Sequence, residues 1–159
     1  MYSSFKGNSK VPSFNDTCIS GPDYLNGLEP ILTRWRFAAK SAHSDISRCY
    51  HRISTSLLDN SLRRLWLKPV LGTNTAWEEY CVTKVSFGDI LGGCGSTCAI
   101  WNTSERFMSE EARSNLAQNV YMDDIALLQY FDTPGGCDEL IREVDQGLVK
   151  GSLPVKCWV

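Results

Sequence analysis

The segment that most constrains the fold is the string Tyr121-Met122-Asp123-Asp124, in which two acidic residues stand between apolar runs. Adjacent residues of a β-strand point to opposite faces of a sheet, so two neighbouring carboxylates can address one site only where the chain bends. The apolar runs on either side suit two short strands. The sequence therefore predicts a tight hairpin, with strands at residues 119–122 and 125–130 and the two aspartates at its tip.

The aspartates at this tip also indicate binding of a divalent cation. Two like charges side by side repel each other, and burial raises that cost. A bound divalent cation removes the penalty, and carboxylate oxygens are the ligands that Mg²⁺ prefers. A third carboxylate is expected from another strand, and Asp45, in a strand-like stretch at residues 41–48, is the candidate.

Three such carboxylates suit phosphoryl transfer by two metal ions, which commonly lie about 3.5–4 Å apart. One ion activates an attacking 3′-hydroxyl, and the other binds a triphosphate and stabilises the leaving pyrophosphate. Asp45 and Asp123 would hold the ions, with Asp124 assisting. The alternative is that Asp123 and Asp124 form an ordinary solvated hairpin tip and that Asp45 is an exposed strand end.

Length and composition indicate a globular chain. The 159 residues are enough for one domain with a core, and 43% hydrophobic with 21% charged residues is typical of folded proteins. The formal net charge of -2 argues against tight independent binding to DNA or RNA, because free-standing nucleic-acid binders are usually basic. It is compatible with an active-site module whose basic neighbours lie elsewhere in a longer chain.

The seven cysteines do not follow a metal-binding or disulfide pattern. No CxxC pair is present, and neither histidine is near Cys94 and Cys98, which are four residues apart. We therefore expect reduced intracellular thiols rather than a zinc site. No signal peptide and no apolar run of the roughly 20 residues needed to cross a bilayer is present.

The rest of the chain predicts an α+β fold, an antiparallel sheet with helices packed on one face. A helix is expected to start near Pro22 and to be kinked by Pro30. Ser104 is expected to cap a later helix that ends near Gln118. The other expected elements are a strand at 41–48, a helical turn at 58–62, a hairpin of strands at 65–67 and 80–87, an irregular glycine-rich segment at 88–95, a turn at 133–136, a helix at 138–150 with Leu140 or Ile141, Val144 and Leu148 inward, and a final strand at 153–159.

Several motifs, in order, resemble those of reverse transcriptases. Asp45-Ile46-Ser47-Arg48-Cys49-Tyr50 and Tyr121-Met122-Asp123-Asp124 are similar to the two carboxylate motifs of these enzymes. Further segments resemble blocks of Pao/BEL-type LTR retrotransposons, so that the resemblance covers nearly the whole chain. These segments are Asn15-Asp16, residues 21–26, residues 32–36, Arg64-Leu65-Trp66, residues 85–88 and residues 148–158.

The resemblance implies a reverse-transcriptase palm with part of the fingers, cut from a Pol polyprotein. Residues 1–40 would be fingers and a lead-in segment and residues 41–159 the palm core, with thumb and RNase H absent. The activity would be RNA-directed DNA polymerisation from dNTPs on an RNA or DNA template-primer, in cytoplasmic particles and without membrane contact. The fragment alone is expected to be inactive.

The resemblance also implies roles for single residues. Asp45, Asp123 and Asp124 would be catalytic and would bind two Mg²⁺ ions, or Mn²⁺ in their place, with Ile46 as a further metal ligand. The substrate-binding residues would be Tyr50 as the steric gate against a ribose 2′-hydroxyl, Phe87 and Gly88 beside the incoming nucleotide, Tyr121 and Met122 near the primer terminus, and Lys156 near the nucleotide phosphates.

One departure from the pattern concerns the segment after Gly88. Where these elements usually have a Ser-Pro pair, this chain has Asp89-Ile90-Leu91-Gly92-Gly93, and Asp89 is expected to oppose nucleotide binding by its charge. Two other hypotheses remain: a catalytically inactive remnant that acts as a nucleic-acid- or protein-binding module, and an unrelated α+β domain with structural aspartates. His43 and His51 are expected to be structural, and the five tryptophans are expected in the core or an interface.

Overall fold

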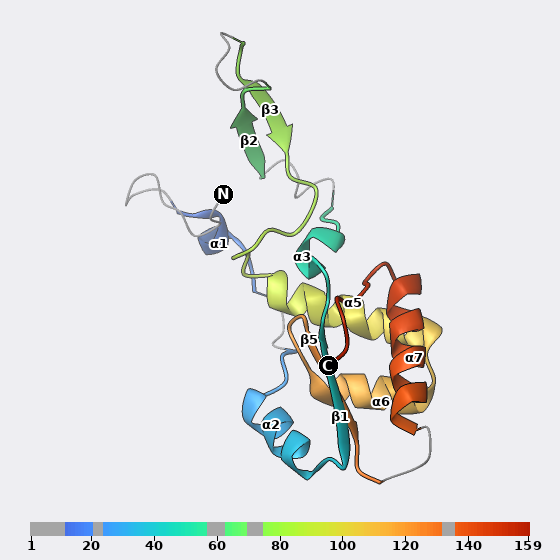
Figure 1. The fold of residues 1–159 in the computed structure, drawn as a ribbon. Helices are drawn as coiled ribbons and strands as arrows, with labels where there is room; N and C mark the ends of the chain where they lie inside the picture. Colours follow the sequence, from blue (N-terminus) through green and yellow to red (C-terminus); the bar gives the residue numbers. More distant parts are fainter. Residues whose placement is uncertain (1–11, 21–23, 57–62, 70–74, 132–135) are drawn as a thin grey trace. The chain divides into compact units, whose positions relative to one another are not determined.

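The computed structural model describes residues 12–20, 24–56, 63–69, 75–131 and 136–159. The chain divides into two compact units (Figure 1). The first unit consists of Met1–Ile19 and Tyr50–Gly92, and the second of Ser20–Cys49 and Gly93–Val159. Both contain antiparallel strands and helices, so the chain is a mixed α+β protein.

A three-stranded antiparallel sheet forms the centre of the second unit. Its order is β1 (Lys40–Asp45), β5 (Asp124–Gln129) and β4 (Val120–Tyr121). One face carries Ala42, Ser44 and their partners Leu127 and Ile125, all of which are buried. The opposite face carries His43, so the alternation of burial along β1 follows the period of a strand. The predicted hairpin at residues 119–130 is confirmed.

Helices cover both faces of this sheet. Helices α6 (Glu110–Asn119) and α7 (Gly136–Lys150) pack against β5 on the side away from α2 (Leu28–Phe37), as Figure 1 shows. Trp35 of α2 stacks on His43 and donates a hydrogen bond of 2.7 Å to Ser41. The prediction of helices on one face alone is therefore wrong, because α2 covers part of the other face.

Helix α7 has the face that the sequence predicts. Its residues Leu140, Val144 and Leu148 are buried, at the spacing of four that places side chains on one side of a helix. Gly151 follows its last residue, Lys150, and donates a backbone hydrogen bond to Gly147.

Two helices differ from the expectation at their N-terminal ends. Ser104 lies inside α5 (Gly92–Phe107), where its hydroxyl donates to the Trp101 carbonyl, and Ser109 is the N-cap of α6. The apolar spacing continues across the break between the two helices, so the sequence pattern did not show it. Gly92, Gly93 and the residues after them, which we expected to be irregular, form the first turn of α5.

Helix α2 begins later than expected. Gly27 is its N-cap, so Pro30 lies in the first turn, where a backbone N–H would have no partner within the helix. Pro30 therefore neither kinks nor splits the helix. The predicted start near Pro22 falls outside the described residues, as do the turn at 58–62 and most of the turn at 133–136.

The first unit contains the second predicted hairpin. Strands β2 (Arg64–Leu67) and β3 (Glu78–Cys81) pair antiparallel, although β3 ends well before Phe87. Two short helices accompany them: α1 (Phe14–Thr17), which has a capping box at Ser13, and α3 (Cys49–Arg52), whose first residue is assigned to the second unit.

The last residues of the chain run along β1 rather than forming a full strand. Ile46 and Val155 form an isolated antiparallel bridge, and backbone hydrogen bonds join Lys156 to Asp45 and Val159 to His43. None of the described helices is both long and apolar enough to span a membrane.

Candidate active site

The two acidic motifs meet at one end of the sheet in the second unit. Asp45, the last residue of β1, pairs with Asp124, the first residue of β5, and Asp124 pairs with Tyr121 of β4. Directly paired residues of an antiparallel sheet lie on the same face with their Cβ atoms about 4.5–5.5 Å apart. The register therefore places Asp45, Asp124 and Tyr121 in one row across the sheet.

Asp123 stands beside this row, in a two-residue turn. Met122 has a φ of 59°, the left-handed conformation that matches such turns to the twist of a hairpin. The Asp123 carbonyl accepts a hydrogen bond of 3.0 Å from the Ile46 N–H, which ties the turn to the end of β1. The side chain of Ile46 is buried in the core, so this residue can offer a metal ion only its backbone carbonyl.

Lys156 is the cation of this site. Its Nζ atom lies 2.9 Å from Oδ1 of Asp45, and its backbone N–H donates to the Asp45 carbonyl. The hydrogen bond to Asp45 and the negative charge of that carboxylate raise the pKa of Lys156 above its usual range. Lys156 is therefore a charged partner held against the first predicted carboxylate.

The carboxylates affect one another. Partial burial raises the pKa of Asp123, and the charges of Asp45 and Asp124 raise it further, while a hydrogen bond that its carboxylate accepts from its own backbone N–H and the charge of Lys156 lower it. Like charges on directly paired residues destabilise a sheet. One ammonium cannot neutralise three carboxylates, so the site retains an excess of negative charge.

His43 lies two residues before Asp45 in β1 and therefore on the same face of the sheet, next to the row. Its Nε2 atom is 3.4 Å from Oδ1 of Asp124, and its ring stacks on Trp35. A small cavity of about 140 Å³ lies next to it, lined mainly by apolar side chains of α2 together with Tyr121 and Asp124. His43 thus contacts a predicted catalytic residue, whereas His51 is exposed.

The donor set suits a hard divalent cation, because the side-chain ligands are carboxylates. In the conformation described, no three His, Cys, Asp or Glu side chains among the described residues are arranged to hold a metal ion together. The ion pair between Lys156 and Asp45 engages one of the three carboxylates. Metal binding would therefore require the carboxylate side chains to converge.

Tyr50, Phe87 and Gly88, which we predicted to lie beside the incoming nucleotide, belong to the first unit. Tyr121 and Met122, predicted near the primer terminus, belong to the second. The rings of Tyr50 and Phe87 meet edge to face, with their centroids 5.3 Å apart. Gly88 has a φ of 85°, and no atom lies within 4 Å of where its Cβ would be, so the backbone conformation and not the space calls for glycine. The Gly88 carbonyl accepts a hydrogen bond of 2.8 Å from Asn15.

Asp89, whose charge we expected to oppose nucleotide binding, is buried and neutralised. Its side chain is 2% exposed and forms a buried ion pair with Arg63, whose side chain is 6% exposed. The same carboxylate accepts a hydrogen bond of 2.9 Å from the Ser86 N–H. Asp89 therefore anchors the turn that carries Phe87 and Gly88, and Arg63 neutralises it. Arg63 could not be predicted as a partner of Asp89, because nothing in the spacing links two residues so far apart.

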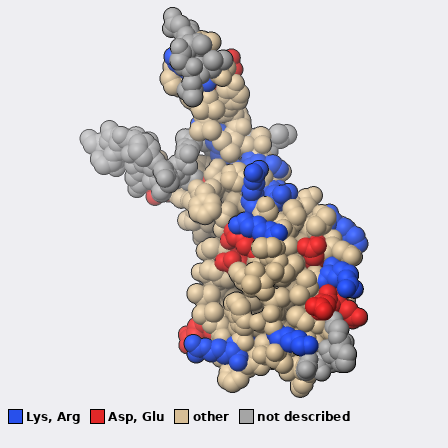
Figure 2. Space-filling model, viewed as in Figure 1, with Lys and Arg blue, Asp and Glu red and all other residues tan. Residues whose placement is uncertain are grey.

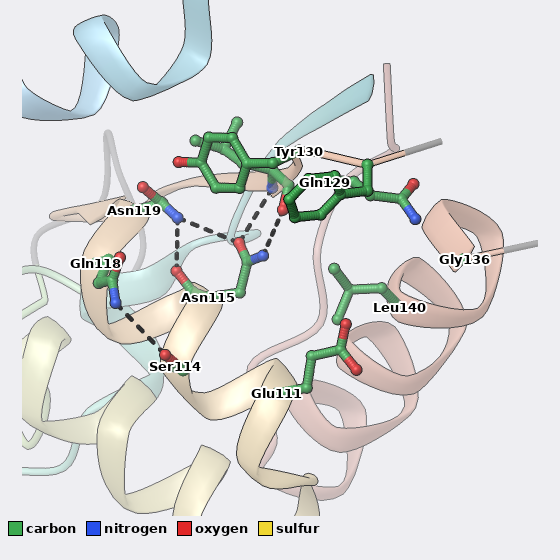
Figure 3. Close-up of a pocket in the computed structure, with 11 residues that line it drawn as sticks. Glu111, Ser114, Asn115, Gln118, Asn119, Gln129, Tyr130, Gly136 and Leu140 are labelled. Carbon is green, nitrogen blue, oxygen red and sulfur yellow. Dashed lines mark hydrogen bonds between the residues drawn. The ribbon is translucent and has the colours of Figure 1, made fainter. Parts of the chain in front are cut away.

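A larger pocket of about 410 Å³ lies elsewhere in the second unit, between α6, the end of β5 and the start of α7 (Figure 3). Its polar wall is occupied by internal hydrogen bonds. The Asn115 amide donates to the Leu128 carbonyl at 2.7 Å and accepts from the Leu128 N–H at 3.1 Å, and Asn119 donates to Asn115. The Asn115 amide holds α6 on β5, and Asn119 bonds to Asn115 within α6, so we assign both a structural role.

The fold and the site together define an α+β protein with three carboxylates and a lysine at one end of an antiparallel sheet. Comparison of the sequence with models of known protein families and with curated proteins gives no match.

Proposed function

We propose that this chain is the palm region of an RNA-directed DNA polymerase, similar to the reverse transcriptases of Pao/BEL-type LTR retrotransposon polyproteins. The observation that carries the proposal is the register of the second unit. Asp45 pairs with Asp124, and Asp123 lies in the adjacent turn. Two acidic motifs far apart in the sequence thus share one end of a sheet, which two-metal nucleotidyl transfer requires of its ligands.

Asp45, Asp123 and Asp124 would hold two Mg²⁺ ions, or Mn²⁺ in their place, with the Ile46 carbonyl as a further ligand. When bound, the ions would activate the primer 3′-hydroxyl and stabilise the charge of the leaving pyrophosphate. Lys156 supports this assignment, because an ammonium beside Asp45 would be available to a nucleotide phosphate once Asp45 serves as a ligand.

In this proposal the aromatic pair of the first unit contacts the incoming dNTP. Tyr50 would exclude the ribose 2′-hydroxyl, and its ring is held by an edge contact with Phe87. Tyr50→Val is therefore expected to admit ribonucleotides without abolishing extension. Equal discrimination by the variant and the unchanged protein would remove Tyr50 from this role.

The proposal is tested by primer extension on an RNA template with Mg²⁺ and dNTPs. The chain is fused to the upstream fingers and downstream thumb of a related element whose own palm is active. Asp123→Asn is expected to abolish extension, whereas Glu105→Gln, which changes an exposed carboxylate on α5, is expected to leave it unchanged. If the folded fusion does not extend the primer, the polymerase hypothesis fails and the hypothesis of a catalytically inactive remnant takes its place.

A second test needs no fusion. Binding of Mn²⁺ to the chain is measured by electron paramagnetic resonance of the free ion. Asp123→Asn is expected to weaken binding about tenfold or more, since it removes a charged ligand from the site. Lys156→Met is expected to tighten binding, because it removes a cation that holds Asp45. Equal affinity in all three proteins would argue against a metal site at these residues.

A further inference from the structure

Two tryptophans of the first unit are exposed on one face of the β2–β3 hairpin. Trp66 is 60% and Trp77 58% exposed, so neither lies in the core; we expected the tryptophans in the core or in an interface. Trp66 pairs with Glu79, and Trp77 stands one residue before β3; alternation continued from Glu79 puts the Trp77 ring on the same face as Trp66. Large exposed aromatic rings on a hairpin of this size indicate a binding surface rather than a structural one.

The charges on this face distinguish it from the opposite one. Arg64, two residues before Trp66 in β2, shares its face, and Lys68, one residue after the end of β2, continues the alternation on that side. The Lys68 ammonium lies 5.5 Å from the centre of the Trp77 ring, and Arg64 forms an ion pair of 2.6 Å with Glu79. The face therefore combines two indole rings with an excess of positive charge.

The opposite face has another character. Among the paired residues it carries Leu65, Leu67 and Tyr80, with Glu78 as the charged one, whose carboxylate accepts a hydrogen bond of 2.7 Å from the Tyr80 hydroxyl. Arg63, two residues before Leu65, is buried in its ion pair with Asp89. This face is aliphatic and acidic, so it does not suit a phosphate backbone. The hairpin thus has a cationic aromatic side and an acidic apolar side.

We propose that the cationic aromatic face of the hairpin binds single-stranded nucleic acid, with bases stacked on Trp66 and Trp77 and phosphates beside Lys68 and Arg64. Aromatic side chains that stack on bases, beside cations that follow the backbone, are the common means of binding single strands without sequence preference. In Figure 2 the described basic side chains of the visible face are scattered among acidic ones. Strand binding by one small cationic face of the hairpin is therefore compatible with the net charge of -2.

The inference rests on the proposed function only for the identity of the strand, which would be the template. Binding itself requires neither metal ions nor polymerisation. A failure of primer extension and a failure of strand binding are therefore distinguishable, since the second is measured on the chain without dNTPs.

The test uses the full chain and three labelled oligonucleotides of equal length: single-stranded DNA, single-stranded RNA and an abasic DNA with the same phosphates. Fluorescence anisotropy is expected to show binding to both strands with bases and at least fivefold weaker binding to the abasic strand. Equal affinity for the abasic strand would overturn base stacking.

The variants compare the two faces of the same hairpin. Trp66→Ala and Trp77→Ala are each expected to weaken binding roughly 5- to 100-fold, whereas Tyr80→Ala, on the opposite face, is expected to change it less than twofold. Trp66→Phe is expected to retain most of the affinity, since a smaller ring still stacks. Similar losses for Tyr80→Ala and Trp66→Ala would indicate unfolding of the hairpin or another binding site, and would overturn the assignment.

A protein partner is the competing occupant, and a second copy of the chain is the simplest one. Light scattering distinguishes it from nucleic acid. The proposal expects Trp66→Ala to leave the molar mass in solution unchanged. A self-associated chain that Trp66→Ala converts to a monomer, with strand binding unaltered, would assign this face to protein and refute the proposal.

Discussion

Substitution of Asp89 by Asn tests whether the buried ion pair holds the turn that carries Phe87 and Gly88. The Asn side chain can still accept the hydrogen bond from the Ser86 N–H, which spans 2.9 Å. The change therefore removes one charge and leaves the Arg63 guanidinium buried without its carboxylate.

The expected cost is large, because both partners are almost fully buried. With side chains 6% and 2% exposed, water cannot replace the lost partner of Arg63. Its remaining contacts are the Lys84 carbonyl at 3.3 Å and the ring of Phe14, whose centre is 4.8 Å away. Removal of one partner of a buried pair costs about 3–5 kcal/mol, so we expect Asp89→Asn to lower the stability of the first unit by that amount.

The ion pair between Arg64 and Glu79 is the matched control. It lies in the same unit with a distance of 2.6 Å, but its side chains are 55% and 33% exposed. Exposed pairs contribute about 0–1 kcal/mol, so Glu79→Gln should have little effect. Replacement of both buried partners, Arg63→Met with Asp89→Leu, is expected to recover most of the loss, since no unpaired charge remains.

Native-state hydrogen exchange followed by mass spectrometry gives the free energy of opening for peptides of each unit separately. Peptides that cover residues 80–92 should open more easily in Asp89→Asn, while peptides of α7 keep their protection. A loss below about 1 kcal/mol, or one equal to that of Glu79→Gln, would refute the assignment of Asp89 as a buried anchor.

Three further predictions concern the second unit. Gly95→Ala in α5 should raise the stability measured by urea denaturation by about 0.5–1 kcal/mol, because the new Cβ would have no neighbour within 4 Å. Gly151→Ala should lower it by about 1–3 kcal/mol, because its Cβ would lie 2.9 Å or less from side-chain atoms of Thr103. The same sign for both variants would contradict the packing described. Asn115→Ala should cost about 2 kcal/mol or more, since it leaves two buried backbone groups of β5 without their partner, and faster amide exchange of Leu128 would show it. Burial and neighbouring charges raise the pKa of Asp123, so the folded chain binds this proton more tightly than the unfolded chain. The contribution of the proton to stability is complete below the unfolded pKa of about 3.9 and is lost as the pH rises through the folded pKa. Asp123→Asn should therefore flatten the decline of stability that begins near pH 4, and an unchanged pH profile would contradict that sign.

The local elements with strong periodicity could be predicted from the sequence. The α7 helix and the hairpin around Asp123 have clear apolar patterns and end at residues that favour turns. The break between α5 and α6 could not, because its signal is a single cap at Ser109 inside a continuous helical pattern. The position of Pro30 was misread for a related reason: the residue type is informative only once the first residue of the helix is known.

The part of the candidate site formed by residues adjacent in the sequence could be predicted. The Asp123-Asp124 pair required a bend, and the structure has a turn there. The role of Asp89 was not accessible, because a charge in a sequence has no indicated partner until the fold places one beside it. The contact of His43 with Asp124 was missed for the same reason, since it depends on the register of β1 with β5.

The hydrogen bonds between Asn115 and Leu128 also bear on the behaviour of the sheet in solution. Strand β4 pairs with β5 only at Val120 and Tyr121, so beyond Ile125 no third strand from the described part of the chain lies beside β5. The amide of Asn115 occupies the N–H and C=O of Leu128 and thereby imitates the missing strand. An open edge is where sheets of separate molecules join and aggregate. The side chain that fastens α6 to the sheet therefore also prevents a foreign strand from extending it.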